Sequence, residues 1–366
     1  MRVLFFGTYD ARVHPRIRTV RQGLAAAGVE VPERNVPLEL DTATRVDMLR
    51  RPWRVVLLGA RLLARWWRLW FDSRDVGRVD AVVVGYLGHF DVHLARLRFR
   101  GRPVALDHLA SARDIAVDRG TTSPWLLSAL GRLDRSALRA AEVPFVDTEE
   151  QRAALPPSQR SRATVVAVGA PQEWFAARPA EREARPDGPA LTAVFFGLYT
   201  PLQGAPVIGR ALALLAGSGV AVTMVGRGQD LPATRAAARE DTDVTWIDWL
   251  DPAALPALVA RHDVCLGIFG TGEKALRVVP NKVYQGAAAG CAIVTSDTEP
   301  QRRALGGAAV FVPPGDPEVL AAALRDLAAD RGALGDLRSA AAARADEAFR
   351  PEVVVAPLLE RLGEPR

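Results

Sequence analysis

The chain repeats one pattern in both of its halves: a short apolar run, then a loop of glycine and polar residues, then a segment with helical spacing. Short apolar runs that alternate with helices are typical of parallel strands whose sheet is covered on both faces. We therefore expect an α/β fold of two Rossmann-like, doubly wound domains that face a central cleft. The expected strands are 3–6, 29–31, 80–84, 103–106, 143–146 and 164–168 in the first half, and 191–196, 221–225, 244–247, 264–268 and 291–297 in the second.

The length of the chain also favours two domains, because 366 residues are many for a single hydrophobic core. Residues 176–189 are rich in Arg, Glu, Pro and Ala without periodicity, which predicts an interdomain linker. The expected units are an acceptor-binding domain over 1–175 and a nucleotide-binding domain over 190–348. Residues 349–366 are expected to form a C-terminal helix that packs back on the first domain.

Amino-acid composition and net charge indicate which kinds of binding partner to expect. Hydrophobic residues make up 49% of the chain and charged residues 24%, as in an ordinary soluble protein. The net charge of +5 comes from basic residues spread along the chain. This spread favours an anionic substrate or an acidic membrane surface over nucleic acid. Because Met1 and Arg2 lead directly into the first strand, we expect no signal peptide and a cytoplasmic protein, and we expect the two cysteines, Cys265 and Cys291, to be buried and reduced.

A short helix around residues 280–289 carries the strongest sign of a binding site. Pro280 in its first turn and Gly290 just past its end follow the usual asymmetry of helix ends. Asn281 and Lys282 lie in the first turn, and a helix N-terminus with a cation beside it attracts anions. Lys274 and Lys282 are the only lysines among 47 basic residues, which indicates that a compact charge is needed there. Gln285 projects from the same helix one turn later and is a candidate hydrogen-bond partner for a ribose hydroxyl.

Three loops after strands of the second half carry pairs of glycines. Glycine lets a backbone approach a phosphate closely and offer its N–H groups. Together with the helix at Pro280 these loops predict a diphosphate cradle, although ordinary turn glycines are the alternative for any single loop. The pairs are Gly197 with Gly204, Gly226 with Gly228, and Gly270 with Gly272.

Polar residues also follow the strands of the first half, at the sheet edge where open α/β folds bind ligands. This edge is expected to hold a hydroxylated acceptor, with turn or cap roles as the alternative for each residue. The acceptor-binding candidates are Thr8, His89, Asp91, Ser111 and Asp114, and the catalytic candidates are Asp107 and His108. The triplet Asp241-Thr242-Asp243 precedes a strand and is interpreted as a turn, and no histidine spacing indicates a metal site.

Residues 51–71 predict a long basic amphipathic helix. Arg54, Arg61, Arg65 and Arg68 share one helical face, and four tryptophans and several aliphatic residues occupy most of the rest. Such a helix can lie in a membrane interface. The alternative is a helix that packs on the sheet with its arginines extended to solvent. The interruptions by arginine exclude a transmembrane span.

The motifs of the second half resemble a known family. The stretches 195–204 (FFGLYTPLQG), 225–229 (VGRGQ), 280–285 (PNKVYQ) and Ser296-Asp297 are similar to those of the retaining glycosyltransferases often called family 4, which have the GT-B fold. In the first half, 85–91 and 107–118 resemble one bacterial branch of that family. The resemblance extends over nearly the whole chain.

The resemblance implies a nucleotide-sugar donor, most often a UDP- or GDP-sugar, bound by the second domain. It implies an acceptor hydroxyl bound by the first domain, transfer with retention of anomeric configuration, and no required metal or further cofactor. Lys282 joins His108 and Asp107 as a catalytic candidate. The donor-binding candidates are Gly197, Tyr199, Gln203, Gly204, Gly226, Arg227, Gly228, Gly270, Glu273, Arg277, Asn281, Lys282, Val283 and Gln285.

The chain departs from the family pattern at specific positions. The usual pair of glutamates falls at Arg277 and Gln285, with Glu273 as a replacement for the first, and Gln203 stands where lysine is common. A catalytically degenerate nucleotide-sugar-binding protein and a GT-B-fold sugar-nucleotide epimerase are therefore the alternatives. The acceptor class stays open among a glycan, a lipid-linked molecule and a natural product. If the helix over 51–71 lies in a membrane interface, we expect it to make peripheral contact with the inner face of the membrane. We expect no nucleic-acid partner.

Overall fold

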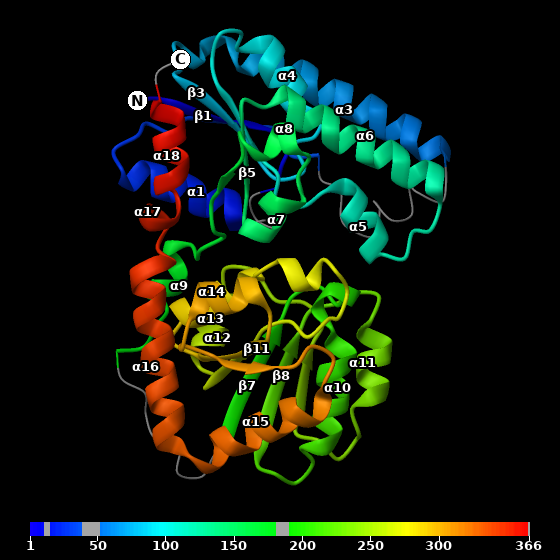
Figure 1. Ribbon diagram of the computed structural model, residues 1–366, viewed down its shortest axis with the longest axis vertical. Coiled ribbons are helices and arrows are strands. Elements are labelled where there is room, and N and C mark those ends of the chain that lie inside the picture. Colours follow the sequence, from blue (N-terminus) through cyan, green and yellow to red (C-terminus); the bar gives the residue numbers. More distant parts are fainter. Residues whose placement is uncertain (11–14, 39–51, 181–189, 365–366) are drawn as a thin grey trace.

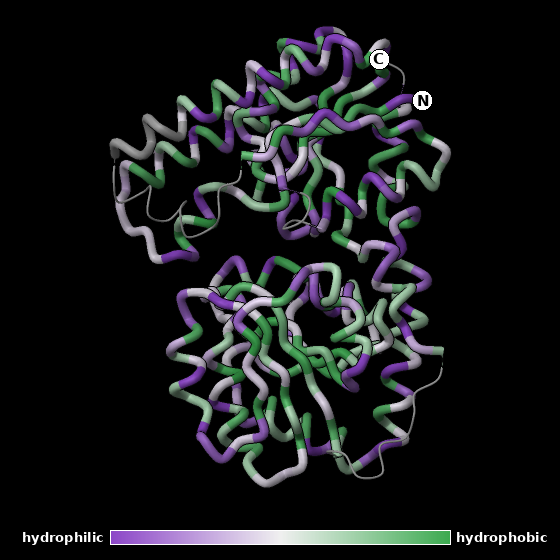
Figure 2. The backbone as a smooth tube through the Cα atoms, turned by 180° about the vertical axis from the view of Figure 1, so that it is seen from behind, coloured by the Kyte–Doolittle hydropathy of each residue, from purple (hydrophilic) through white to green (hydrophobic). Residues whose placement is uncertain are grey.

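The computed structural model describes residues 1–10, 15–38, 52–180 and 190–364, with the backbone alone over 52–58. The chain folds into two lobes, each built on one sheet with helices on both faces (Figure 1). Within each lobe the hydrophobic strands lie at the centre, and hydrophilic segments lie outside (Figure 2). The predicted fold class is confirmed at the level of these two parallel sheets.

The N-terminal sheet has six parallel strands in the order β2-β1-β3-β4-β5-β6. The second strand was predicted four residues too early: residues 29–31 do not form it, although Glu30 makes an isolated bridge with Arg2. The strand that pairs with β1 begins at Glu33, which lies opposite Phe5. The strands are β1 (Val3–Gly7), β2 (Glu33–Asn35), β3 (Ala81–Val84), β4 (Val104–Asp107), β5 (Val143–Val146) and β6 (Thr164–Val165).

Side chains of β1 alternate between the two faces of this sheet, as the two-residue period of a strand requires. Leu4 and Phe6 pack with the helices on one face, and Val3 and Phe5 pack with those on the other. The first face is covered by α3 (Pro52–Asp72), α4 (Asp91–Arg98) and α6 (Pro124–Ala140), and the second by α1 (Pro15–Ala26) with the C-terminal helices α17 (Pro351–Val354) and α18 (Ala356–Gly363). The short helices are η1 (Arg74–Val76), α5 (Ala112–Asp118), α7 (Glu149–Ala154) and α8 (Pro157–Arg160).

The C-terminal sheet has six parallel strands in the order β12-β11-β10-β7-β8-β9. They are β7 (Leu191–Phe196), β8 (Val220–Val225), β9 (Val244–Ile247), β10 (Val264–Leu266), β11 (Ala292–Ser296) and β12 (Val310–Val312). The edge strand β12 and the helix before it were not predicted, because only three residues pair there. The helices are η2 (Pro201–Gln203), α10 (Ala205–Leu214), α11 (Leu231–Ala237), α12 (Leu255–Ala260), η3 (Ala275–Arg277), α13 (Asn281–Ala288), α14 (Glu299–Leu305) and α15 (Pro317–Ala329).

Two segments connect the lobes. Helix α9 (Gln172–Ala176) leads out of the N-terminal lobe at the start of the predicted linker, of which residues 181–189 lie outside the described residues. Helix α16 (Arg331–Ala348) runs along the C-terminal lobe and returns the chain to the N-terminal lobe (Figure 1). There Val354, Val355, Leu358 and Leu362 join the core of the first sheet. The predicted single terminal helix is therefore two short helices packed on the N-terminal domain.

Candidate functional site

Helix α13 begins at the carboxyl end of its sheet with an open N-terminus. The helix starts at Asn281, one residue later than predicted, because Pro280 is the extended N-cap residue with ψ 150°. No described side chain caps this end, so the first-turn N–H groups remain available to an anion. Gly286 lets the helix lie close to β10, since a Cβ there would come within 2.5 Å of Cys265.

Lys282 extends from this first turn into the body of the domain. Its ammonium donates to the side-chain oxygen of Gln203 and lies 3.6 Å from the centroid of the Phe195 ring. The residue is only 4% exposed, and burial lowers the pKa of Lys282 to about 7. The Lys282 amine is therefore shielded from water, and its hydrogen-bond partner Gln203 is neutral. A nearby anion would raise its pKa and favour the charged ammonium.

The glycines of the three loops are needed for close contact between the loops. A Cβ at Gly226 would lie 2.0 Å from the carbonyl oxygen of Gly197, and one at Gly204 would lie 2.4 Å from the amide nitrogen of Gly270. Gly228 approaches the backbone of Tyr199 in the same way, at 2.3 Å. The loops are thus stacked backbone on backbone. Gly197 faces Lys282, whose Nζ would lie 3.5 Å from a Cβ placed there.

The side chains of two donor candidates pack inside the domain. Tyr199 is buried with its ring against Phe195, and Val283 is buried on the inner side of α13. The Tyr199 hydroxyl is enclosed without a partner among the described residues. Gln285 is 5% exposed on α13, and Arg227 is exposed in the loop after β8.

On the N-terminal side, Asp134 of α6 organises the acceptor candidates. Its carboxylate accepts from the Ser111 hydroxyl at 2.9 Å and from the Ala112 N–H at 2.8 Å, and His89 Nε2 lies 2.9 Å from it. Burial alone would raise the pKa of Asp134, but the contacts from His89, Ala112 and Ser111 outweigh burial and lower it to about 2. Asp134 therefore fixes His89 and the start of α5 together.

His108 lies beside His89, with ring centroids 5.6 Å apart in an edge-to-face arrangement. The backbone N–H of His108 donates to the Phe145 carbonyl, and its Nδ1 is enclosed without a partner among the described residues. Burial, with the charge of His89, lowers the pKa of His108 to about 4. His108 is therefore a neutral imidazole at neutral pH, able to accept or donate a hydrogen bond.

Asp107, a predicted catalytic residue, forms a buried ion pair in the structure. Its Oδ1 lies 2.9 Å from Nε of Arg16, and both side chains are almost fully buried. Burial raises the pKa of Asp107 despite this partner. Asp147 lies near the same arginine, and its burial raises the pKa to about 7. This ion pair is structural, because a buried charge needs a partner.

The acceptor candidates Thr8 and Asp91 are bonded to one another. The backbone N–H and the hydroxyl of Thr8 donate to one Asp91 oxygen at 2.7 Å and 2.8 Å, and the Trp66 indole donates to the other at 2.8 Å. Burial raises the pKa of Asp91. These bonds join β1, α3 and α4, and they account for both residues without a substrate.

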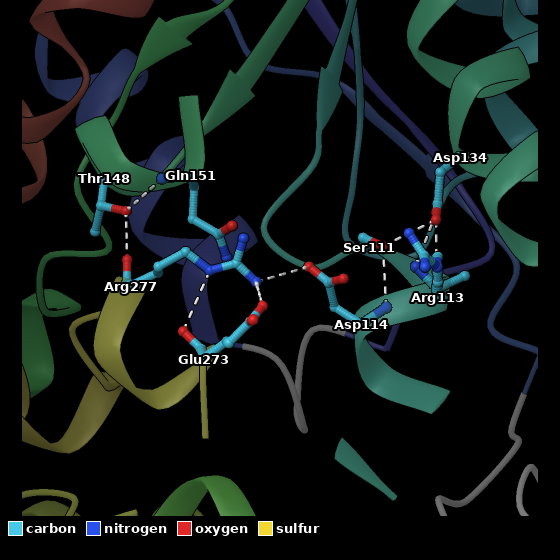
Figure 3. A network of polar contacts seen from close by, with 9 residues as sticks. Ser111, Arg113, Asp114, Asp134, Thr148, Gln151, Glu273 and Arg277 are labelled. Atoms are coloured by element: carbon cyan, nitrogen blue, oxygen red, sulfur yellow. Dashed lines mark hydrogen bonds and ion pairs between the residues drawn. The ribbon is translucent and has the colours of Figure 1, made fainter. Parts of the chain in front are cut away.

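A network of polar contacts connects the two domains (Figure 3). The Thr148 hydroxyl donates to the Arg277 carbonyl at 2.7 Å, and the Arg277 guanidinium lies 3.6 Å from Asp114. Arg277 also contacts Glu273, whose side chain is 94% exposed. Arg277 of the C-terminal domain thus contacts Asp114, an acidic residue of α5 in the N-terminal domain. Ser111 joins the same network because its hydroxyl accepts from the Asp114 N–H.

Four buried or half-buried charges were not predicted from the sequence. Arg16 and Asp134 lie inside helices among other charged residues, so their spacing gives no signal. Asp147 follows a strand without any further chemical signal, and Lys274 was noted only as one of the two lysines near α13. In the structure, burial lowers the pKa of Lys274, which lies near Asp118 and Asp114 of α5. Among the residues that the structure describes, no three His, Cys, Asp or Glu side chains cluster as metal ligands.

The arrangement of two facing parallel sheets with a helix N-terminus at the interface defines the GT-B fold class. Sucrose-phosphate synthase from Thermosynechococcus elongatus superimposes with a TM-score of 0.69 at 14% identity, covering 98% of this chain and 98% of that chain. Anabaena Alr3699/HepE in complex with UDP-glucose gives 0.68 at 14% identity, with 99% of each chain covered. A structure described as trehalose-6-phosphate from E. coli bound with UDP-2-fluoro glucose gives 0.65 at 13% identity, with 100% of each covered.

The sequence comparison is narrower than the structural one. Residues 190–330, which form most of the C-terminal domain, match the family described as glycosyl transferases group 1. No curated protein sequence matches the chain. The GT-B fold predicted from the motifs is thereby confirmed, and the family match places the glycosyltransferase likeness in the domain that carries Lys282 and α13.

Proposed function

We propose that the protein transfers a sugar from a nucleoside-diphosphate sugar, a UDP- or GDP-sugar, to an acceptor hydroxyl. The observation that carries the proposal is Lys282, a buried cation with a neutral partner beside the open N-terminus of α13. The match of 190–330 to glycosyl transferases group 1 supports this chemistry. The UDP-glucose and UDP-2-fluoro glucose in the titles of two structural neighbours support a uridine donor.

The proposed mechanism stabilises the leaving diphosphate. Breaking the bond between sugar and phosphate builds negative charge on the phosphate oxygens. Preorganised N–H groups of Asn281 and Lys282, with the Lys282 ammonium, lower that barrier. The neutral His108 orients the donor sugar or the acceptor from the other domain, and contact between the domains excludes water. Retention requires the acceptor hydroxyl to enter on the face that the phosphate leaves, and no step in this scheme uses a metal.

A thermal-shift panel of UDP, GDP, TDP and ADP with their common sugars tests the donor. A ligand that binds the native state raises the melting temperature by mass action. We expect one nucleotide to raise it clearly, and Lys282→Met to abolish the rise. Arg210→Met, which removes an exposed cation of the same domain, serves as the matched control. A panel without any shift would contradict the proposed donor site.

Turnover separates the proposed transferase from its alternatives. We expect nucleotide release only when an acceptor is present, unchanged by a chelator, and a product whose anomeric proton coupling in NMR matches the donor. His108→Ala should lower turnover more than about tenfold while donor binding stays intact. Binding without turnover over a broad acceptor panel would favour a degenerate sugar-nucleotide-binding protein, consistent with Arg277 and Gln285 at the glutamate positions. An epimerised donor without acceptor would favour the epimerase.

A further inference from the structure

Helix α3 has two apolar stripes, and the protein uses only one of them. The inner stripe consists of Trp66, Leu69 and Trp70, which pack against the N-terminal sheet and α4. The outer stripe consists of Leu63, Trp67 and Phe71, spaced by four residues so that they lie one above another on the helix. Leu63 is 64% exposed and Trp67 is 70% exposed.

The outer stripe is ordered in spite of its exposure. The rings of Trp67 and Phe71 lie 4.7 Å apart, and the Arg74 guanidinium lies 4.1 Å above Phe71. Phe71 is half-buried, so Leu63 and Trp67 are the exposed members of the stripe. A lone exposed leucine needs no explanation, but neighbouring exposed apolar side chains indicate a surface that meets an apolar partner. Trp125 of α6, another long helix on this face of the sheet, is 74% exposed.

Positive charge is concentrated on the same helix. Over residues 52–72 the sequence has four arginines and one aspartate, a formal charge of +3 against +5 for the whole chain. It also holds four of the eight tryptophans. Arg61 and Arg68 are exposed on the same helix, and Arg68 shares its charge with Asp72 in an exposed ion pair of 3.3 Å. Arginine beside tryptophan on a helix surface matches the boundary between anionic head groups and acyl chains.

The basic surface continues from the end of α3. Arg98 of α4 donates to Ser73, directly after α3, and lies over the Trp70 ring. Beyond it, an open pocket is lined by His93, Arg96, Arg100 and Arg102, with Glu142 as the acidic member. Although Arg96 pairs with Glu142, cations outnumber acids in this region beyond the end of α3. Anionic lipid attracts such a region within a Debye length.

We propose that the outer stripe of α3 docks on an anionic lipid bilayer, with Leu63, Trp67 and Phe71 in the head-group region and Arg61 and Arg68 on lipid phosphates. A protein partner would need about 800 Å² of complementary surface. The stripe offers only three apolar side chains of one helix, far less than that area, whereas a bilayer requires no matching surface. No described helix has the length and apolarity to cross a bilayer, so the contact is peripheral. This inference does not depend on the proposed transferase activity.

Vesicle sedimentation tests the proposal on the full chain. Wild-type protein should sediment with vesicles of phosphatidylcholine containing about 30% phosphatidylglycerol, not with phosphatidylcholine alone, and raised salt should release it. The double variant Leu63→Ser, Trp67→Ser should weaken partitioning about tenfold or more. Arg61→Gln with Arg68→Gln should weaken it by roughly 25-fold at low salt, about fivefold for each arginine.

Trp249→Ser is the matched control, because Trp249 is 63% exposed on the other domain. It should sediment like the wild type. All variants should keep the wild-type melting temperature and its nucleotide-induced shift, which separates this surface from the donor site. Wild-type protein that stays in the supernatant with anionic vesicles would overturn the proposal. So would undiminished binding of either double variant, or light scattering that shows a dimer lost on Trp67→Ser.

Discussion

At the scale of single residues, Lys282 illustrates how burial makes the charge of a lysine depend on its surroundings. Burial disfavours the ammonium, the nearby Cys265 opposes this only in part, and the pKa of Lys282 falls to about 7. A diphosphate at the α13 N-terminus would favour the charged form and raise that pKa toward its ordinary value. Binding of the proposed donor and protonation of Lys282 are therefore linked.

This linkage predicts the pH dependence of donor binding. In the complex the pKa of Lys282 lies above its free value of about 7, so the complex carries more protons than the free protein above that pH. UDP affinity should fall by at most about tenfold per pH unit as the pH rises above about 7. Below about pH 7, Lys282 should not make the UDP affinity depend on pH. Isothermal titration calorimetry across this range measures it.

Two variants isolate the residue responsible. Lys282→Met should bind UDP weakly and without that slope, whereas Arg210→Met should keep the wild-type slope. An identical slope in Lys282→Met would assign the proton to another group. Asp147 is a second group that titrates in this pH range, because burial also raises its pKa to about 7. It belongs to the buried cluster with Arg16, and its charge also acts on Tyr284 of α13, so an identical slope in Lys282→Met would point to Asp147.

The sequence located this residue but not the surroundings that give it its properties. Lys282, His89 and His108 stand out because they follow strands or begin a helix. Asp134 and Arg16 do not, since each is one charged residue within a helix rich in charges. Their importance depends on burial against segments far away in the chain, such as Asp107, which is 91 residues from Arg16. Asp91 and Asp107 were predicted at the correct sheet edge, but their partners Trp66 and Arg16 were not visible from spacing.

At the scale of elements, the β/α alternation was predictable because buried parallel strands read as continuous apolar runs. The errors fall on elements that tertiary contacts define. The three-residue strands β2 and β12 exist because their neighbours pair with them. Packing of α17 on α1 depends on Gly23, where a Cβ would lie 2.1 Å from the Pro351 carbonyl oxygen and 2.8 Å from a methyl group of Val355.

Gly23→Ala should therefore destabilise the protein by about 1–3 kcal/mol, because the two backbones must separate and the core around Val355 opens. Gly335→Ala provides the control. Gly335 also lies in a helix, α16, but nothing lies within 4 Å of its added methyl group. That variant should gain about 0.5–1 kcal/mol from helix propensity. Urea unfolding followed by circular dichroism measures both, and equal effects of the two substitutions would contradict the packing argument.

At the scale of the whole molecule, the sequence predicted two domains but not how they touch. The polar contacts are Thr148 with the Arg277 carbonyl, Asp114 with Arg277, and Glu150 of α7 with Arg303 of α14. Leu109 of the N-terminal domain also packs against the apolar core cluster around α13. The polar part of such an interface allows the domains to move relative to one another. Arg277 was predicted to contact the donor, and that role stays a prediction; the structure places its guanidinium beside Asp114 of the other domain.

The pair of Glu150 and Arg303 permits a direct test of this interface. Arg303 makes two contacts with Glu150, at 2.9 Å and 3.1 Å. Glu150→Arg places like charges opposite each other, so the domains should separate and the radius of gyration from X-ray scattering should increase. The charge swap Glu150→Arg with Arg303→Glu should restore the wild-type curve, because the attraction is re-formed in reverse. Since the pair is partly exposed, its energy is at most about 1 kcal/mol, and the opening by Glu150→Arg should shrink at high salt. A curve that Glu150→Arg leaves unchanged at low salt, or that the swap fails to restore, would show that other contacts hold the domains together.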